Sequence, residues 1–368
     1  MKVKIGDLTK IKTGKLDANV SSEDGKYPFF TCSKEPLKIS TYSYDCECVL
    51  VAGNGDLNVK YYNGKFDAYQ RTYIIEANGS GKLYMPYLYY FMEDYIDELR
   101  KQAIGGVIKY IKLANLTDAL IELPSVDEQK SIVEILKKVK GILDKRNDEI
   151  RELDNLIKAR FVEMFGDPVA NDKGWKMKPL LDMGKCKNGM NFHYDDSGVE
   201  ISCLGVGDFK DLSVIDNTKK LSIVSLNEMP SEEYLLKDGD IVFVRSNGNK
   251  DLVGRSLAIY PGKLPTTFSG FCIRYRIHDD EITVPYLLRV LKMESMRKKM
   301  AGRGANIQNL NQQILGTLVI PVPPIELQNQ FVDFVRAIDK SKFDTMTFAP
   351  IYDIINLYLH THFYQGRR

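Results

Sequence analysis

Two sets of polar and basic residues, each beside glycines, are suited to bind a nucleic acid. Arginine and lysine donate hydrogen bonds to phosphates, and arginine, asparagine and glutamine can also bond to the edges of bases. We expect Gly105 and Gly106 to let the backbone approach a duplex; for any one of the other candidates, a solvated surface role is the alternative. The candidates in the first half are Asn54, Tyr69, Gln70, Arg71, Gly105, Gly106 and Lys109. Those in the second half are Arg245, Ser246, Asn247, Asn249, Lys250, Arg255, Arg297, Lys298, Lys299, Arg303 and Asn306.

The sequence lacks the motifs of the catalytic and cofactor sites that would suit such a protein. It has no Asn/Asp-Pro-Pro-aromatic motif to hold the target amine of an amino-methyltransferase. It has no Gly-x-x-x-x-Gly-Lys-Ser/Thr phosphate loop either, and the Gly-x-Gly at Gly53 to Gly55 is typical of a turn. His360 and His362 would face apart in a helix with no further ligand nearby, so we expect no metal site. The sequence therefore predicts no catalytic residue and no bound cofactor.

The composition is that of an ordinary globular protein, with 44% hydrophobic and 27% charged residues. The net charge is only +2, so any grip on an anionic polymer must come from local basic surface. The six cysteines form no Cys-x-x-Cys pair, and no stretch approaches the ~20 apolar residues of a membrane span. We expect a soluble protein in the reducing cytoplasm, without contact with a membrane.

The chain contains an internal repeat. Met85-Pro86-Tyr87-Leu88 opens an apolar helical pattern, and Val284-Pro285-Tyr286-Leu287 opens a similar one 199 residues later. The same offset relates Gly105 to Gly304 and Gln129 to Gln328 without a gap. Such a period is too long for a solenoid, so each copy must be a domain with its own core.

Further upstream the similarity weakens, and the offset drifts as it would if loops differed in length. Asp7 and Gly14 resemble Asp182 and Gly189. Apolar β-branched runs that end in Asn-Gly turns predict strands, and the Pro-initiated segments predict helices. We therefore predict an α+β protein with two similar domains of mixed α/β structure, residues 1–124 (the first module) and 169–322 (the second module). Two long antiparallel coiled-coil spacer helices, residues 125–168 and 323–368, are predicted to separate them.

The first spacer carries a heptad pattern, because its apolar positions alternate four and three apart, with Arg146 in the one slot that breaks the series and charged residues between the positions. A helix from Val126 to Met164 would extend roughly 58 Å at ~1.5 Å per residue, further than one turn of DNA at ~34–36 Å, and could set a distance. The alternative is a helix that merely packs on its parent domain. The predicted seam of the first spacer consists of Ile132, Leu136, Val139, Leu143, Ile150, Leu153 and Ile157.

The second spacer helix is predicted to begin near Ile325 and to pair with the first. Its pattern is less regular than that of the first. Pro350 should interrupt or restart it, because proline lacks the amide donor and clashes with the preceding turn. The predicted seam of this helix consists of Phe331, Val335 and Ile338.

The chain resembles the specificity subunits of type I restriction-modification systems over essentially its whole length. The motifs that carry the resemblance are Leu-Pro-x-x-x-Glu-Gln at Leu123 to Gln129 and the Phe-Val-Glu-Met-Phe-Gly-Asp run at Phe161 to Asp167. Each is weak alone, and together with the internal repeat they are specific. Leu327 replaces the first copy's Glu128, which together with Pro350 puts a fully symmetric second spacer in doubt.

The resemblance implies that each module reads one half of a bipartite sequence in double-stranded DNA and that the helical core docks two modification subunits. Those subunits would bring S-adenosylmethionine and adenine methylation, and restriction subunits would add ATP-driven translocation and cleavage. Two other readings stay open: a solitary DNA-binding regulator with two reading heads, and a coiled-coil scaffold whose modules bind protein. The recognised bases and the length of the spacer between them do not follow from the sequence.

Overall fold

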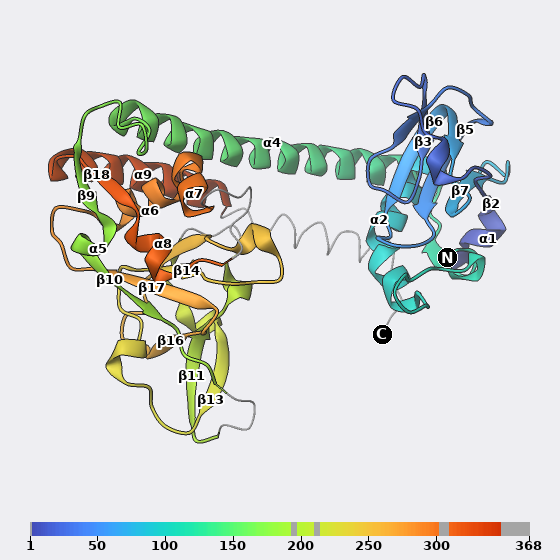
Figure 1. The fold of residues 1–368 in the computed structure, drawn as a ribbon. Helices are drawn as coiled ribbons and strands as arrows, with labels where there is room; N and C mark the ends of the chain where they lie inside the picture. Colours follow the sequence, from blue (N-terminus) through green and yellow to red (C-terminus); the bar gives the residue numbers. More distant parts are fainter. Residues whose placement is uncertain (1, 193–196, 210–213, 302–308, 347–368) are drawn as a thin grey trace. The chain divides into compact units, whose positions relative to one another are not determined.

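The computed structural model describes residues 2–192, 197–209, 214–301 and 309–346 (Figure 1). Arg303, Asn306, Pro350, His360 and His362 lie outside the described residues. The described residues divide into two compact units, one within residues 2–148 and the other within residues 149–344. Among the described helices, none is long and apolar enough to cross a membrane.

The first module is built on a six-stranded sheet in the order β2-β7-β5-β6-β3-β4. All neighbours are antiparallel except β3 and β6. The sheet strands are β2 (Thr9–Thr13), β3 (Tyr27–Phe30), β4 (Leu37–Ile39), β5 (Tyr44–Ala52), β6 (Val59–Ala68) and β7 (Thr72–Ala77). A separate pair joins β1 (Lys2–Lys4) to β8 (Leu120–Glu122), and short helices α1 (Ile5–Leu8), η1 (Ala18–Val20) and α3 (Leu113–Thr117) complete the module.

Helix α2 (Met85–Gln102) covers the sheet of the first module (Figure 1). Pro86 lies in its first turn, where the missing amide costs no helical hydrogen bond. Its apolar face, which includes Tyr87, Leu88 and Phe91, is buried in one core with Val49 and Val51 of β5. The helix and the central strand therefore stabilise each other by apolar burial.

The second module repeats this plan with two smaller sheets, β10-β17-β14-β15-β12 and β13-β11-β16. Its strands are β10 (Gly184–Asn188), β11 (Val199–Leu204), β12 (Val214–Ile215), β13 (Ser222–Leu226), β14 (Asp240–Val244), β15 (Ser256–Ile259), β16 (Thr266–Phe268) and β17 (Cys272–Ile277). The outer pair is β9 (Lys176–Pro179) with β18 (Val319–Val322). Its helices are α5 (Leu180–Met183), η2 (Val206–Asp208), η3 (Thr218–Lys220), η4 (Glu232–Tyr234), η5 (Lys250–Leu252), α6 (Val284–Lys292), α7 (Glu294–Ala301) and α8 (Gln312–Gly316).

Equivalent atoms make equivalent bonds in the two modules. The Tyr87 hydroxyl donates to the Glu122 carbonyl at 2.9 Å, and the Tyr286 hydroxyl donates to the Pro321 carbonyl at 2.9 Å. Strands β3 and β6 pair in parallel, as do β11 and β16. The predicted internal repeat of two mixed α/β domains is confirmed.

The two modules differ at β6 of the first, which corresponds to two separate strands, β15 and β16, in the second. β6 runs unbroken for ten residues and pairs with both β5 and β3. In the second module β15 pairs with β14 and β16 pairs with β11, and a turn at Pro261 and Gly262 lies between them. Gly262 has a φ of +61°, which favours glycine. This break splits the sheet and explains why the sequence offset drifts in this region.

Helix α4 (Val126–Phe165) is one continuous helix of 40 residues. Ser125 and Glu128 cap its start, since the Ser125 amide donates to Glu128 Oε2 at 2.8 Å and the Glu128 amide donates to Ser125 Oγ at 3.3 Å. Ile132 and Leu136 join the core of the first module, and Ile157 joins that of the second. The seam residues between them, Val139, Leu143, Ile150 and Leu153, are half-buried.

Helix α9 (Ile325–Met346) runs antiparallel to the last turns of α4 within the second unit. The Phe331 ring centroid lies 5.4 Å from that of Phe161, and Lys342 Nζ lies 2.6 Å from Asp154 Oδ1. Residue numbers therefore increase along α9 in the direction in which they decrease along α4. The predicted seam residues Val335 and Ile338 are partly buried on the same core. A coiled coil along the whole predicted seam stays a prediction, because residues 347–368 are not described.

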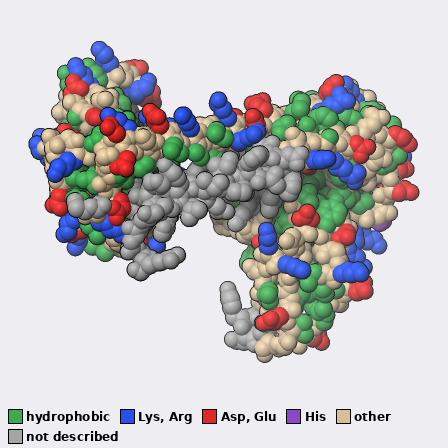
Figure 2. Space-filling view, turned by 180° about the vertical axis from the view of Figure 1, so that it is seen from behind, with side chains coloured by type: hydrophobic (Ala, Val, Ile, Leu, Met, Phe, Trp, Pro, Cys, Tyr) green, Lys and Arg blue, Asp and Glu red, His purple; other side chains and the backbone are tan. Residues whose placement is uncertain are grey.

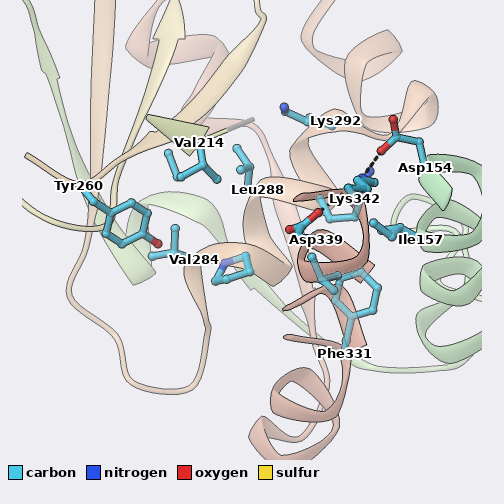
Figure 3. Close-up of a pocket in the computed structure, with 14 residues that line it drawn as sticks. Asp154, Ile157, Val214, Tyr260, Val284, Leu288, Lys292, Phe331, Asp339 and Lys342 are labelled. Atoms are coloured by element: carbon cyan, nitrogen blue, oxygen red, sulfur yellow. Dashed lines mark hydrogen bonds and ion pairs between the residues drawn. The ribbon is translucent and has the colours of Figure 1, made fainter. Parts of the chain in front are cut away.

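A small cavity of about 130 Å³ lies beside this helix pair, between α4, α6, α9 and β15 (Figure 3). Its wall is apolar at Ile157, Leu288 and Phe331, and the ion pair of Asp154 with Lys342 lies at its rim. Burial, followed by the charges of Arg289, Arg297 and Arg255, lowers the pKa of Lys292 on this wall to about 8.

Candidate nucleic-acid interface

Three loops of the first module are tied together by backbone hydrogen bonds. The Gly53 amide donates to the Arg71 carbonyl at 2.8 Å, and the Gly55 amide donates to the Lys109 carbonyl at 3.0 Å. An isolated bridge also joins Asn54 to Tyr110. The fold therefore gathers three of the predicted DNA-contacting residues, Asn54, Arg71 and Lys109, although they are far apart in the sequence.

The loop that carries Lys109 has an exposed apolar tip. Ile104 and Tyr110 close it with reciprocal backbone bonds of 3.0 and 2.8 Å, and Val107 and Ile108 are exposed. Gly105 has a φ of +117°, and a Cβ there would lie 2.6 Å from the Ile108 carbonyl oxygen. The two predicted glycines therefore differ: Gly105 is required by the loop, whereas Gly106 faces open space.

The side chains of Tyr69 and Gln70 are more constrained than the sequence indicated. Gln70 Nε2 donates to Asp17 Oδ1 at 2.8 Å, and its backbone amide donates to the Leu16 carbonyl. Tyr69 is half-buried, and its amide donates to the Phe30 carbonyl. Arg71 is exposed, so it is the more accessible donor of this loop.

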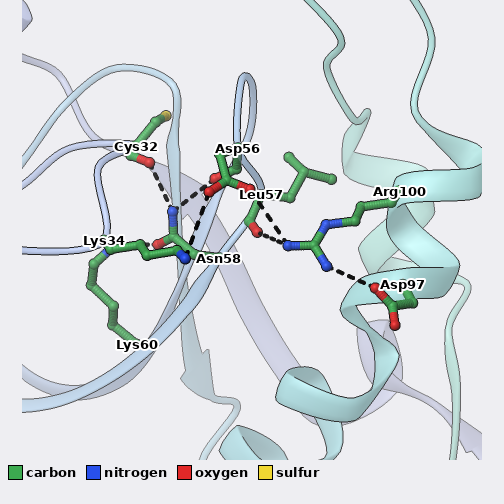
Figure 4. Close-up of polar contacts among 8 residues, drawn as sticks. All are labelled: Cys32, Lys34, Asp56, Leu57, Asn58, Lys60, Asp97 and Arg100. Carbon is green, nitrogen blue, oxygen red and sulfur yellow. Dashed lines mark hydrogen bonds and ion pairs between the residues drawn. The ribbon is translucent and has the colours of Figure 1, made fainter. Parts of the chain in front are cut away.

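A polar cluster holds the chain that follows Gly55 (Figure 4). Asn58 Nδ2 donates to the carbonyls of Cys32 and Asp56 at 2.8 and 2.9 Å. Arg100 Nη2 donates to the Leu57 carbonyl at 3.1 Å, and its Nη1 lies 2.7 Å from Asp97 Oδ1. The bond to the Cys32 carbonyl connects this segment to the loop after β3, and the bond from Arg100 connects it to α2.

The second module forms the same tie with other side chains. The Arg245 amide donates to the Phe271 carbonyl at 2.7 Å, and the Leu310 amide donates to the Arg245 carbonyl at 2.8 Å. The matching bond of the first module runs from the Ile111 amide to the Gly53 carbonyl. Arg245 is half-buried, and its Nη1 donates to the Gly270 carbonyl at 3.3 Å; Ser246 follows it in the same loop.

The loop after Arg245 is shaped by its own asparagines. Asn247 Oδ1 accepts from the Asn249 amide at 2.8 Å, and Asn249 Oδ1 accepts from the Asp251 amide at 3.0 Å. Lys250 starts η5, and Arg255 Nε donates to the Asp251 carbonyl at 3.3 Å. The asparagines therefore fix the backbone of the loop through their oxygens.

The three residues of the predicted basic run, Arg297 to Lys299, have different contacts in the structure. Arg297 is half-buried and donates to the carbonyls of Val253 and Gly254 at 3.3 and 3.2 Å, and its burial lowers its pKa. Lys298 is exposed and pairs with Glu294 at 2.7 Å, while Lys299 is exposed. Arg297 supports the loop before Arg255, a role that its spacing did not indicate.

Basic and acidic side chains are interspersed over the face drawn in Figure 2. This mixture agrees with the small net charge. Within the described part of the chain, no group of three or more His, Cys, Asp or Glu side chains could hold a metal ion. The two loop clusters are candidate sites because of the donors that they gather and because their backbone geometry is repeated in both modules.

Comparison with known families agrees with this repeated architecture. Residues 1–153 and 172–350 match the model of the type I restriction modification DNA specificity domain. The chain belongs to this specificity family. The first stretch contains the first module and α4 as far as residue 153, and the second contains the second module from residue 172 onward together with α9.

Curated specificity subunits are similar to the chain over different lengths. The type I restriction enzyme EcoDI specificity subunit of Escherichia coli is 37% identical over 156 residues, 42% of this chain and 34% of that protein. The StySPI specificity subunit of Salmonella potsdam is 26% identical over 65% of this chain and 54% of that protein. The chain thus matches only a third to about half of these two relatives. The MjaVIII specificity subunit of Methanocaldococcus jannaschii is 22% identical over 92% of this chain and 85% of that protein.

Two solved structures share the fold of this specificity family. The S subunit of a type I restriction-modification system from M. genitalium has a TM-score of 0.57 at 17% identity and covers 99% of this chain and 96% of its own. A chain from a study of complex assembly and conformational transition of the type I R-M system has a TM-score of 0.56 at 15% identity, with 98% and 97% covered. These likenesses support a fold built from two repeated domains.

Proposed function

We propose that this chain is the non-catalytic DNA-recognition subunit of a type I restriction-modification complex, and that each module reads one half of a bipartite target. The observation that carries the proposal is the same tie between reading loops in both modules, with different side chains at matching places. In the first module Gly53 is tied to Arg71, and in the second Arg245 is tied to Phe271. A shared scaffold with different side chains suits a protein whose two halves must read different bases.

The spacer helices would set the distance between the half-sites and dock two modification subunits. The half-buried seam of α4, which includes Val139, Leu143 and Ile150, is apolar enough to pack on the second spacer helix and so to hold that distance. The modification subunits would supply S-adenosylmethionine and methylate adenine, and restriction subunits would supply ATP-driven cleavage. This chain itself would bind neither cofactor.

The experiment that tests the proposal is a map of methylated adenines in cells that carry this chain with its modification subunits. We expect a split motif of two short defined sequences around an undefined gap. Exchange of residues 1–122 for the corresponding module of another specificity subunit should then change one half of the motif only. Changes in both halves, or a continuous motif, would contradict the assignment of one half-site to each module.

Arg71 is the exposed donor on which the reading role of the first module can be tested. If its guanidinium bonds to a base, Arg71→Ala should cost ~1–3 kcal/mol on the cognate half-site and relax its specificity. A phosphate contact would instead weaken binding to all sequences equally and reduce the dependence of the binding constant on salt. Binding that is unchanged in both respects would remove Arg71 from the interface.

A further inference from the structure

Arg71 of the first module and Phe271 of the second occupy the same place in the repeated fold. Arg71 follows β6, which pairs in parallel with β3, and Phe271 follows β16, which pairs in parallel with β11. The carbonyl of each residue accepts the inter-loop bond, from the Gly53 amide at 2.8 Å and from the Arg245 amide at 2.7 Å. The residue after each accepts from an equivalent glycine, Gly14 or Gly189, at 3.0 Å. Backbone hydrogen bonds therefore establish that positions 71 and 271 are equivalent, although one carries an arginine side chain and the other a phenylalanine.

The Phe271 ring is presented to solvent by a constrained backbone. Its side chain is 60% exposed, and among the described phenylalanines it alone is exposed. Its amide donates to Ser269 Oγ at 3.3 Å, and its carbonyl accepts from both Arg245 and Ser246. A Cβ on the preceding Gly270 would lie 1.9 Å from Asn191 Oδ1, so this turn is closely packed on its other side. The ring is thus held outside the core by the same bonds that shape the reading loops.

We propose that Phe271 is a specificity-determining residue of the second module and contacts the C5-methyl group of a thymine in its half-site. A phenyl ring offers no hydrogen bond, and the thymine methyl is the apolar group that base pairs display in the major groove. Arg245 and Ser246 bond to the Phe271 carbonyl through their amides, and with the adjacent Asn247 they have polar groups for the neighbouring base edges or phosphates. The inference rests on the proposed function and adds that the two half-sites are read at this place by different chemistry, a cationic donor in one and an apolar ring in the other.

The test is a double-mutant cycle between the ring and the methyl group. The full chain, with its modification subunits, is titrated with the mapped target and with duplexes in which each thymine of the second half-site is replaced in turn by deoxyuridine, which lacks only the methyl. At one position we expect the replacement to weaken binding about fourfold, the effect of removing one buried methyl group. Phe271→Ala should weaken binding to the thymine duplex and make it indifferent to the replacement at that position.

Matched controls separate this contact from a general loss of binding. Deoxyuridine in the first half-site should not couple to Phe271→Ala, and Arg71→Ala should not alter the effect of deoxyuridine in the second. Because Phe271 is exposed, the alanine variant should keep the unfolding midpoint of the wild type. Phe271→Arg should shift the preferred base at that position away from thymine without changing the first half-site.

The outcomes are distinguishable. A second half-site without thymine on either strand, or full sensitivity to deoxyuridine in Phe271→Ala, would overturn the contact while leaving the reading role of the chain intact. Unstacking of a base step that depends on Phe271, reported by 2-aminopurine fluorescence without any methyl effect, would also overturn it in favour of an apolar wedge. If the wild-type complex shows no sequence-specific binding at all, the proposed function fails together with this inference.

Discussion

Gln129 and Gln328 make the same three hydrogen bonds in the two copies of the repeat. Gln129 Oε1 accepts from the Tyr84 amide at 2.8 Å, and its Nε2 donates to the carbonyls of Lys82 and Pro124. Gln328 Oε1 accepts from the Thr283 amide at 2.9 Å, and its Nε2 donates to the carbonyls of Glu281 and Pro323. Both side chains are fully buried in the first turn of a spacer helix, and each connects that helix to its module.

Replacement of Gln129 by alanine should destabilise the first module. The variant would leave the Tyr84 amide and two carbonyls without their partner, at a cost of roughly 1–3 kcal/mol for each group that stays buried. Urea unfolding followed by circular dichroism measures the loss, with the exposed neighbour Lys130→Ala as the control. Equal midpoints for the two variants would show that the buried amide does not hold the helix to the module.

The repeat could be predicted from short sequence motifs, because each motif makes the same contacts in both modules. The Leu-Pro-x-x-x-Glu-Gln element and the Pro-Tyr-Leu helix starts recur with an unchanged offset, since the buried glutamine and the tyrosine hydroxyl both bond to fixed backbone atoms. The heptad pattern was less decisive. Ile132 and Ile157 satisfy it, yet each packs on a module core, because an apolar stripe does not specify what covers it.

Gly105→Ala should disturb the loop that carries Lys109, whereas Gly106→Ala should not. A side chain at the φ of Gly105 costs roughly 1–3 kcal/mol, and its Cβ would overlap the Ile108 carbonyl. Faster hydrogen exchange of the Tyr110 amide, which bonds to Ile104 across the loop, reports the change. If the two variants exchange alike, the positive φ of Gly105 is not what shapes this loop.

Phe331→Ala should destabilise the second unit far more than Asp154→Asn does. The Phe331 ring is buried against Phe161 and Phe165, and its loss should cost about 3–5 kcal/mol. Asp154 is half-exposed in its pair with Lys342, so its loss should cost about 1 kcal/mol or less. Trp175, the single tryptophan, donates to the Phe165 carbonyl and reports unfolding of this unit by fluorescence. Comparable losses would mean that the ion pair, and not the aromatic packing, holds α9 to α4.

Lys292 should make the second unit less stable at neutral than at alkaline pH. Its pKa of about 8 lies below the ordinary value of 10.5, so below pH 8 the folded unit bears the cost of a buried charge. Above pH 8 the folded state releases the proton before the unfolded state does, so the cost shrinks as the pH rises and is gone only above pH 10.5. Lys292→Met should therefore stabilise the unit relative to wild type below pH 8, and this advantage should shrink towards pH 10.

The control for this prediction is Lys298→Met, which alters an exposed lysine of the next helix. Trp175 fluorescence in urea at several pH values measures both variants against the wild type. Only Lys292→Met should show an advantage that depends on pH between 8 and 10. If the difference in stability between Lys292→Met and the wild type stayed constant from pH 8 to pH 10, Lys292 would not be the group that titrates in this range.

The roles of individual polar residues were harder to predict than the fold. The fold brings Arg71, Asn54 and Lys109 together, but Arg297 donates to carbonyls within the protein, which residue type and spacing do not reveal. Phe271 was not among the predicted site residues, because its equivalence to Arg71 rests on backbone hydrogen bonds and the two side chains differ. Arg303 and Asn306, which lie outside the described residues, stay predictions.

The ties between the loops have an evolutionary consequence. The bond from Gly53 to Arg71 and that from Arg245 to Phe271 use only main-chain atoms, so neither depends on the side chain at position 71 or 271. A codon change at position 71 or 271 can thus alter what is presented to a ligand while the supporting frame keeps its shape. Such a frame lets new preferences arise in single mutational steps without a loss of folding on the way.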